Sequence, residues 1–151
     1  MNKEQLTQII EELYIEAKQA KEENEIPVAC CLLLSDGKKY FTHNKVEANN
    51  NPFNHAEFIA LSEAQKDTGL RYFKNSTLIV TLEPCLCCMG AIIKMGVSSL
   101  YYILPDEKGG ALSHYHAFVD DKIQINEIED TRFSSLMNEF FNNLRQTLKE
   151  S

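Results

Sequence analysis

Two short segments of the chain carry residue types that bind a metal ion, and the fold has to bring them together. The first reads H-A-E at residues 55–57, and the second reads P-C-L-C-C at residues 84–88. One imidazole and two thiolates form a zinc site with three protein ligands, whose fourth position stays open for water as in catalytic zinc sites. We therefore predict that His55, Cys85 and Cys88 bind one Zn²⁺ per chain.

The cysteine segment has the features of a helix start. Cys85 and Cys88 are three residues apart, so in a helix they lie on one face within reach of a single ion. Pro84 suits the first turn, where its missing N–H leaves no hydrogen bond unmade, and a helix N-terminus stabilises the thiolates that bind metal. We expect Cys87 to point elsewhere, and a pairing of Cys85 with Cys87 is the alternative.

The histidine segment has two interpretations when it is read alone. Asn54 followed three residues later by Glu57 resembles a helix capping pair, and a histidine beside a helix start is usually not a ligand. The cysteine segment favours the ligand interpretation, because both segments follow a loop or a strand end, where α/β sheets place their ligands. Glu57 is then expected to accept the proton of a water molecule that zinc activates and to deliver it to the substrate.

Alternating helix and strand patterns predict one α/β domain spanning residues 1–151, with helices packed on a central sheet. Apolar residues at helical spacing predict the helices, and short apolar or β-branched runs predict the strands. The predicted helices are 3–23, 55–68, 85–96 and 131–149, and the predicted strands are 28–34, 39–42, 77–82, 100–104 and 123–128. The polar segments 43–54 and 105–121 are predicted loops, and Cys30 and Cys31 are predicted to pack in the core.

Composition and charge limit where the protein works and what it binds. Hydrophobic residues make up 44% and charged residues 25%, and no apolar run approaches the ~18 residues of a membrane span. The polar N-terminus and the odd count of five cysteines argue against export and disulfides, so we expect a cytoplasmic protein without a membrane partner. The net charge is −7, with both ends acidic and residues 26–110 neutral, so a nucleic acid would need a local basic patch.

The two segments and their surroundings resemble the cytidine deaminase superfamily and, more narrowly, the bacterial tRNA adenosine deaminases. The likeness runs over about residues 25–111 and includes E-I-P-V at 25–28, V-T-L-E-P-C at 80–85, Asn44 eleven residues ahead of His55, Asp106 and Lys108. The resemblance implies a three-layer α/β/α fold with a mixed sheet of about five strands. It also implies a hydrolytic deaminase that converts the wobble adenosine of tRNA to inosine and releases ammonia.

The same resemblance implies roles for residues outside the zinc segments. Asn44 would hydrogen-bond the flipped base, Val28 would line its pocket, and the loop with Asp106 and Lys108 would contact the anticodon nucleotides. It further implies a homodimer that completes each site. Without the resemblance, Asn44 is interpreted as a turn residue in an Asn-rich loop, and residues 105–110 are interpreted as a solvated charged loop.

Several positions depart from the family pattern, and all of them lie outside the zinc ligands. Ala29 replaces a glycine, residues 111–116 read A-L-S-H-Y-H in place of the usual Gly-Ser, and the last helix ends with few cations. His114 and His116 in this segment either stack on RNA bases or are ordinary loop histidines. These departures concern the choice of substrate and leave the chemistry of the zinc site unchanged.

Two further functions compete with the tRNA hypothesis. One is a deaminase of a free nucleobase or nucleoside, such as guanine or cytosine, for which an acidic surface is unremarkable. The other is a catalytically silent RNA-binding or dimerisation subunit with structural zinc, which the presence of Glu57 disfavours. The placement of four lysines separates the tRNA hypothesis from the free-base hypothesis. Lysines gathered around the pocket favour RNA, and scattered lysines favour a small substrate. These lysines are Lys38, Lys39, Lys45 and Lys74.

Overall fold

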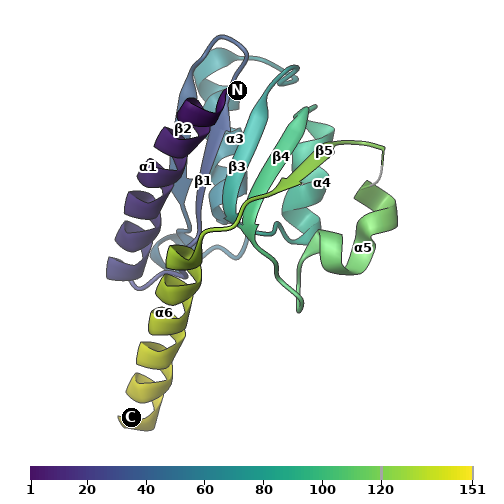
Figure 1. Cartoon of the computed structure of the whole chain (residues 1–151). Helices are drawn as coiled ribbons and strands as arrows, with labels where there is room; N and C mark the ends of the chain where they lie inside the picture. The colour runs from purple at the N-terminus through teal and green to yellow at the C-terminus, as the bar shows by residue number, and fades with distance from the viewer. Residues whose placement is uncertain (120, 151) are drawn as a thin grey trace.

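The computed structural model describes residues 1–119 and 121–150, which form helices on both sides of a sheet (Figure 1). The strands are β1 (Ala29–Leu33), β2 (Lys39–His43), β3 (Thr77–Leu82), β4 (Ser99–Leu104) and β5 (Gln124–Glu127). The helices are α1 (Lys3–Glu22), α2 (Val46–Asn49), α3 (Ala56–Thr68), α4 (Leu86–Lys94), α5 (Ala111–Val119) and α6 (Thr131–Glu150).

The five strands form one mixed sheet in the order β2-β1-β3-β4-β5. β1 pairs antiparallel with both β2 and β3, whereas β3–β4 and β4–β5 are parallel. Helix α4 supplies the crossover that a parallel β3–β4 pair requires. All five residues of β1 are buried, as expected for a continuous apolar run in a strand covered on both faces. The predicted mixed sheet of about five strands is confirmed.

Two hydrophobic cores lie on opposite faces of this sheet. Cys30 and Leu32 of β1 pack with residues of α3 and α4, while Cys31 and Leu33 pack with residues of α1 and α6. This alternation follows from the two-residue period of a strand, and it separates the adjacent cysteines into different cores. Both cysteines are fully buried, which confirms their predicted place in the core. The result is the predicted three-layer α/β/α arrangement (Figure 1).

The two predicted loops are each interrupted by a helix. Residues 43–54 contain α2, whose Glu47 and Ala48 N–H groups donate to the distant carboxylate of Glu25 at 2.9 and 2.8 Å. Residues 105–121 contain α5, so the loop prediction is wrong there, and Asp120 of that range lies outside the described residues. The turn predicted at Lys108-Gly109-Gly110 is present. The residues after it form a helix instead of a loop, because Ala111 and Val119 pack into the core.

Helix α6 begins against the sheet and then leaves it. Phe133 and Leu136 in its first half are buried, whereas Leu144 and Leu148 in its second half are exposed. In Figure 1 the second half, drawn in yellow, runs past the end of the sheet toward the C-terminus. No helix among the described residues is long and apolar enough to cross a membrane.

Candidate metal centre and substrate cavity

Strand direction brings distant segments to one end of the sheet. β1 is antiparallel to β2 and β3, and its first residue, Ala29, pairs with His43, the last residue of β2. The end of β3 lies at the same edge, because Val80 pairs with Cys30. β3 therefore leads into α4 close to the start of β1 and to the end of β2, and α3 begins at the same place.

The three predicted zinc ligands meet at this edge. The donor atoms of His55, Cys85 and Cys88 all lie within 4.8 Å of one another. His55 Nδ1 is 3.7 Å from Cys85 Sγ and 3.5 Å from Cys88 Sγ. A tetrahedral zinc ion with ordinary Zn–S and Zn–N bond lengths requires donor separations of about 3.5–3.8 Å, so the geometry fits zinc. Cys87 is exposed and is not part of the cluster, so the alternative pairing of Cys85 with Cys87 is wrong.

The local electrostatics suit a thiolate ligand. Cys85 occupies the N-cap position of α4, where its sulfur accepts a hydrogen bond from the Cys88 N–H at 3.5 Å. Hydrogen bonds with the Cys88 thiol and with His55 lower the pKa of Cys85 to about 4. The pKa of Cys88 is raised, because its thiol donates to Cys85 and is buried. With a divalent cation present, both sulfurs bind as thiolates.

Glu57 lies beside the ligands and makes few interactions of its own. Its side chain is buried, and its Oε1 atom has no hydrogen-bond partner among the described residues. Burial raises the pKa of this carboxyl group. An unpaired buried oxygen costs free energy of folding, so its retention points to a ligand or a water molecule that occupies the adjacent space.

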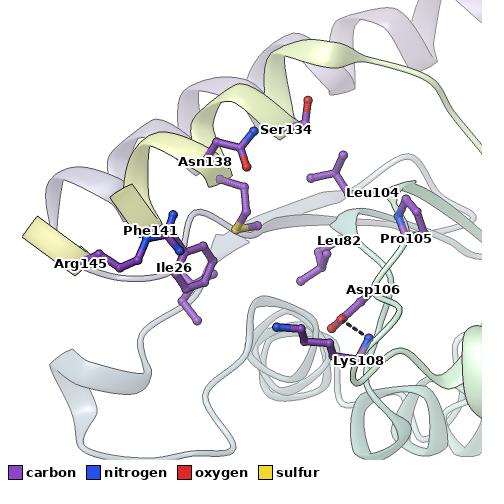
Figure 2. Close-up of a pocket in the computed structure, with 11 residues that line it drawn as sticks. Ile26, Leu82, Leu104, Pro105, Asp106, Lys108, Ser134, Asn138, Phe141 and Arg145 are labelled. Carbon is purple, nitrogen blue, oxygen red and sulfur yellow. Dashed lines mark hydrogen bonds between the residues drawn. The ribbon is translucent and has the colours of Figure 1, made fainter. Parts of the chain in front are cut away.

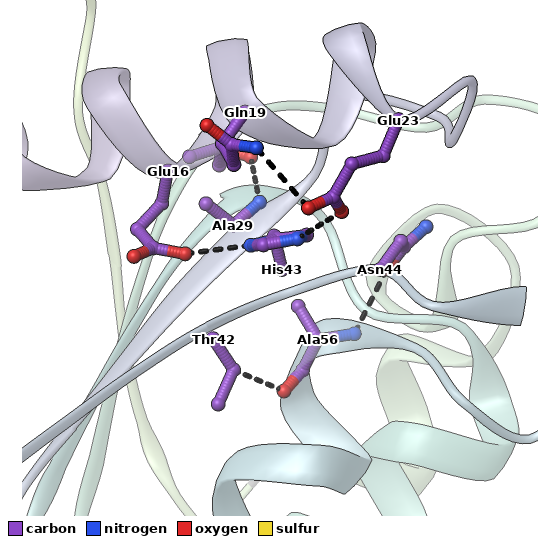
Figure 3. Close-up of polar contacts among 9 residues, drawn as sticks. Glu16, Gln19, Glu23, Ala29, Thr42, His43, Asn44 and Ala56 are labelled. Atoms are coloured by element: carbon purple, nitrogen blue, oxygen red, sulfur yellow. Dashed lines mark hydrogen bonds and ion pairs between the residues drawn. The ribbon is translucent and has the colours of Figure 1, made fainter. Parts of the chain in front are cut away.

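Asn44 holds the start of α3 in place. Its Oδ1 atom accepts a hydrogen bond from the Ala56 N–H at 2.8 Å, and the Thr42 hydroxyl donates to the Ala56 carbonyl at 2.6 Å (Figure 3). The N-cap residue His55 makes no side-chain capping bond, so the Asn54–Glu57 capping interpretation is wrong. Because Oδ1 is engaged with the helix, the Nδ2 amide of Asn44 is the group left to donate to a ligand.

His43, which precedes Asn44, joins the end of β2 to α1. Its Nδ1 atom lies 2.7 Å from Glu16 Oε2, and its Nε2 atom lies 2.6 Å from Glu23 Oε2 (Figure 3). The interaction with His43 lowers the pKa of Glu23. The sequence reading missed this bridge, although Glu16 and Glu23 are seven residues apart and so lie on one face of the helix.

A cavity of about 190 Å³ adjoins the metal ligands. This is smaller than the ~300–1,000 Å³ of sites for drug-sized ligands, so it suits a single ring system such as a base. Val28, Asn44, Glu57 and Asp106 all line it, as do Ile26, Leu82, Glu83, His55 and Cys85. The structure thus brings three of the four predicted substrate residues to the zinc ligands.

Lys108, the fourth predicted substrate residue, lies in a larger groove that adjoins the cavity. The groove has a volume of about 590 Å³ and shares Ile26, Leu82 and Asp106 with the cavity. In Figure 2, Phe141 and Arg145 of α6 lie on one side of it and Asp106 and Lys108 on the other. A second groove of about 520 Å³ is bordered by His55 and Asn44 and by the α6 residues Phe140, Phe141 and Leu144. The second half of α6 therefore borders both grooves.

The four lysines whose placement distinguishes an RNA substrate from a small one do not gather at this site. Lys39 starts β2 and pairs with Leu33, at the end of β1 opposite the cavity. Lys38 precedes it, and Lys74 precedes β3, whose far end leads to the site. Only Lys45, which follows β2, lies at the cavity end. The cations that border the large groove are Lys108 and Arg145.

Fold and ligands together define a class: an α/β/α zinc protein whose three protein ligands leave one position open beside a buried carboxylate. The chain belongs to the family described as the cytidine and deoxycytidylate deaminase zinc-binding region, whose family model matches residues 3–104. Its cofactor is accordingly one Zn²⁺ per chain, and His55, Cys85 and Cys88 form the site that fits it.

Individual known proteins are similar to the chain over most of its length. A tRNA-specific adenosine deaminase of Aquifex aeolicus is 30% identical over 140 residues, covering 88% of this chain and 91% of the relative. A solved structure from a study of A-to-I editing by tRNA deaminases at the wobble position aligns with a TM-score of 0.76 and 29% identity, covering 82% of this chain and 99% of that one. A guanine deaminase from Nitrosomonas europaea has a TM-score of 0.71 at 20% identity, covering 85% of this chain and 80% of that one. At this identity the last match shows the fold alone.

Proposed function

We propose that this protein is a zinc-dependent hydrolytic deaminase that converts the wobble adenosine of tRNA to inosine and releases ammonia. The observation that carries the proposal is the unpaired Oε1 atom of buried Glu57, which lines a base-sized cavity beside three zinc donors. A carboxylate oxygen that accepts no hydrogen bond from the described residues is available for proton transfer. We also propose that residues 1–151 act as one domain and that the protein works in the cytoplasm.

The residues of the cavity divide the work of hydrolysis. Zinc, when bound, supplies a positive charge that makes a water molecule a nucleophile at neutral pH. Glu57 Oε1 accepts a proton from that water and delivers it to the ring nitrogen beside the carbon that bears the amine. The water oxygen bonds to this carbon, and its remaining proton passes through the Glu57 carboxylate to the amine. The carbon–nitrogen bond then breaks, ammonia leaves, and the added oxygen becomes the carbonyl of inosine.

Binding of the base falls to residues that the fold already holds rigid. The Nδ2 amide of Asn44 donates to an acceptor on the base, since its Oδ1 atom is held by the Ala56 N–H. Val28 provides an apolar wall and is itself buried. Asp106 borders the cavity and the groove, and Lys108 in the groove provides a cation for a neighbouring phosphate.

The choice of tRNA as substrate rests on two supports. The first is the relative named tRNA-specific adenosine deaminase, which is 30% identical to this chain over 140 residues. The second support is the groove that continues from the cavity, because a free base needs no such extension. Its border combines Phe141 for stacking with Lys108 and Arg145 for phosphates.

A deaminase of a free base is the second candidate, and one observation favours it. Lys38, Lys39 and Lys74 lie at the far end of the sheet, and the chain carries a net charge of −7. This field opposes a polyanion everywhere except at a local patch. Lys108 and Arg145 supply such a patch at the groove, which is why we place RNA first.

We further propose a homodimer formed through the starts of α3 and α4. Phe53 and Phe58 are 58% and 37% exposed with ring centroids 6.5 Å apart, and Leu86 is 41% exposed. These apolar side chains flank the ligands His55 and Cys85, so a second copy bound here would cover them and wall the site. Light scattering coupled to gel filtration tests this, and Phe58→Glu is expected to give a monomer.

The function is tested by incubating the zinc-loaded protein with an anticodon stem-loop that carries adenosine at the wobble position. A matched stem-loop with guanosine there and a panel of free bases run in parallel. The proposal is supported when inosine forms in the adenosine stem-loop and when neither the guanosine stem-loop nor any free base releases ammonia. Ammonia released from a free base, with the RNA unchanged, establishes the second candidate instead.

A further inference from the structure

Glu83 is a buried carboxylate to which neither the metal centre nor the proposed chemistry gives a role. It lies between the end of β3 and Pro84, is 3% exposed, and lines the substrate cavity. Its Oε1 atom accepts hydrogen bonds from the Asp106 N–H at 3.1 Å and the Ser113 hydroxyl at 2.8 Å. Its Oε2 atom accepts one from the Ser113 N–H at 2.9 Å. All three donors belong to the segment 106–113.

Backbone contacts draw the same segment against the zinc-ligand motif. The Ala111 N–H donates to the Pro84 carbonyl at 2.8 Å, and Gly110 forms a β-bridge with Cys85. At Gly110 a Cβ atom would lie 1.8 Å from Glu83 Oε2, so no side chain fits between the carboxylate and the segment. Glu83 thus lies where the metal-ligand motif and the segment meet.

Both predicted substrate residues of this segment depend on that junction. Asp106 lines the cavity, and its own Oδ1 atom accepts from the Lys108 and Gly109 N–H groups at 3.2 Å each, which shapes the turn. The carboxylate of Glu83 therefore holds this segment at two places, Asp106 and Ser113. Ser113 lies in the stretch where the sequence departs from the family, yet it supplies two of the three donors.

We propose that Glu83 is a positioning residue, which fixes the segment 106–113 and thereby places Asp106 and Lys108 for the substrate. The effect on substrate binding rests on the proposed function. The fixing of the segment by Glu83 is independent of that function. A carboxylate suits this task because it accepts from several donors at once and offers none of its own. Its loss should therefore weaken substrate binding while the zinc site remains.

Glu83→Gln is the informative substitution, because the side chain keeps its size and loses one acceptor. With the amide nitrogen of the new side chain at the Oε2 position, its NH₂ group faces the Ser113 N–H, and both groups are donors. With the nitrogen at the Oε1 position, the Asp106 N–H faces a donor instead. Either orientation leaves a backbone N–H unpaired, and the segment is expected to open more often.

The experiment combines amide hydrogen exchange with steady-state kinetics on the zinc-loaded full chain. In Glu83→Gln, exchange at Asp106 and Ser113 is expected to be roughly tenfold faster, and KM for the stem-loop RNA roughly tenfold higher, because a buried donor has lost its acceptor. We expect kcat to stay within about threefold and zinc content at one per chain, because the hydrogen bonds of the Glu83 carboxylate go to Asp106 and Ser113 and not to the metal-ligand side chains.

Two further variants keep the test decisive. Ser113→Ala removes only the hydroxyl donor and is expected to show changes in the same direction of about threefold, even where Glu83→Gln folds poorly. Glu107→Gln removes an exposed negative charge from the same segment and is expected to leave exchange unchanged, which separates charge from hydrogen bonding.

The proposal is overturned when Glu83→Gln exchanges at the wild-type rate with an unchanged KM, or when it loses zinc and kcat together. The latter result would make Glu83 a support of the metal centre. A wild-type protein that deaminates no RNA overturns the proposed function instead, and the exchange rates at Asp106 and Ser113 still decide whether Glu83 fixes the segment.

Discussion

The metal end and the substrate border of this site are built in different ways. The ligands lie at the starts of α3 and α4, beside buried strand ends, and the side chain of Asn44, which follows β2, accepts a hydrogen bond from the first N–H of α3. The border consists of the segment 106–113 and the exposed second half of α6. Metal binding and proton transfer thus rest on helix starts beside the sheet, whereas the groove next to the cavity is bordered by a loop segment and by half of a helix that leaves the sheet. Substitutions at the two places should have different consequences.

The largest effect is expected at the metal end. Cys88→Ala removes one of three zinc donors, so bound zinc and deaminase activity should both fall below detection. Cys87→Ala is the matched control, because the neighbouring thiol is exposed and outside the ligand cluster. Metal analysis of the purified variants measures the first effect. Full activity of Cys88→Ala would show that another residue binds the metal.

The next effect concerns the proton carrier. Glu57→Gln keeps the volume of the side chain and removes its basicity, so kcat should fall roughly 10²- to 10⁴-fold while one zinc per chain remains. Glu63→Gln, at an exposed position of the same helix, should behave as wild type. A Glu57→Gln protein with near-normal kcat would place the proton transfer elsewhere.

Asn44 connects the two regions, and two substitutions separate its roles. Asn44→Asp keeps an oxygen for the Ala56 N–H but removes the donor for the base, so stability should hold and KM should rise. Asn44→Ala removes both groups and should also lower the free energy of unfolding by about 1 kcal/mol, as the loss of a helix cap does. Urea unfolding and kinetics measure the two effects. Equal KM values for Asn44→Asp and wild type would leave Asn44 a purely structural residue.

The smallest effect is expected at the border. Lys108→Ala and Arg145→Ala should each raise KM for the stem-loop a few-fold, with an affinity that falls less steeply with salt, by a slope of about 0.7 per lost phosphate contact. Lys149→Ala, beyond the groove on the same helix, is the control. Titrations of the stem-loop at several salt concentrations measure the slopes. Unchanged slopes in both variants would favour the free-base candidate.

The same contrast explains what could be predicted from the sequence. The ligands were predictable because Cys85 and Cys88 need only one helical turn to share an ion, and the strands because β-branched runs are local signals. α5 was missed because its stability comes from Ala111 and Val119 packing on a core built by other segments.

The bridge of His43 and the junction at Glu83 were also beyond the reach of the sequence. Each is a polar residue whose partners come from elsewhere in the chain: Glu16 and Glu23 for the first, Asp106 and Ser113 for the second. Local patterns predict neither pairing, since the partners meet only when α1 packs on one face of the sheet and when Gly110 pairs with Cys85 beyond the end of β3.

Hydrolytic deamination is tested most directly by following oxygen from water into the wobble nucleotide. In water enriched with heavy oxygen, the zinc-loaded protein should convert the wobble adenosine of the stem-loop to inosine that carries one heavy oxygen atom, with one ammonia released per inosine. The Glu57→Gln protein at equal zinc content should leave the adenosine unchanged on the same timescale. Unmodified adenosine after incubation with the zinc-loaded wild-type protein would show that the wobble adenosine is not its substrate.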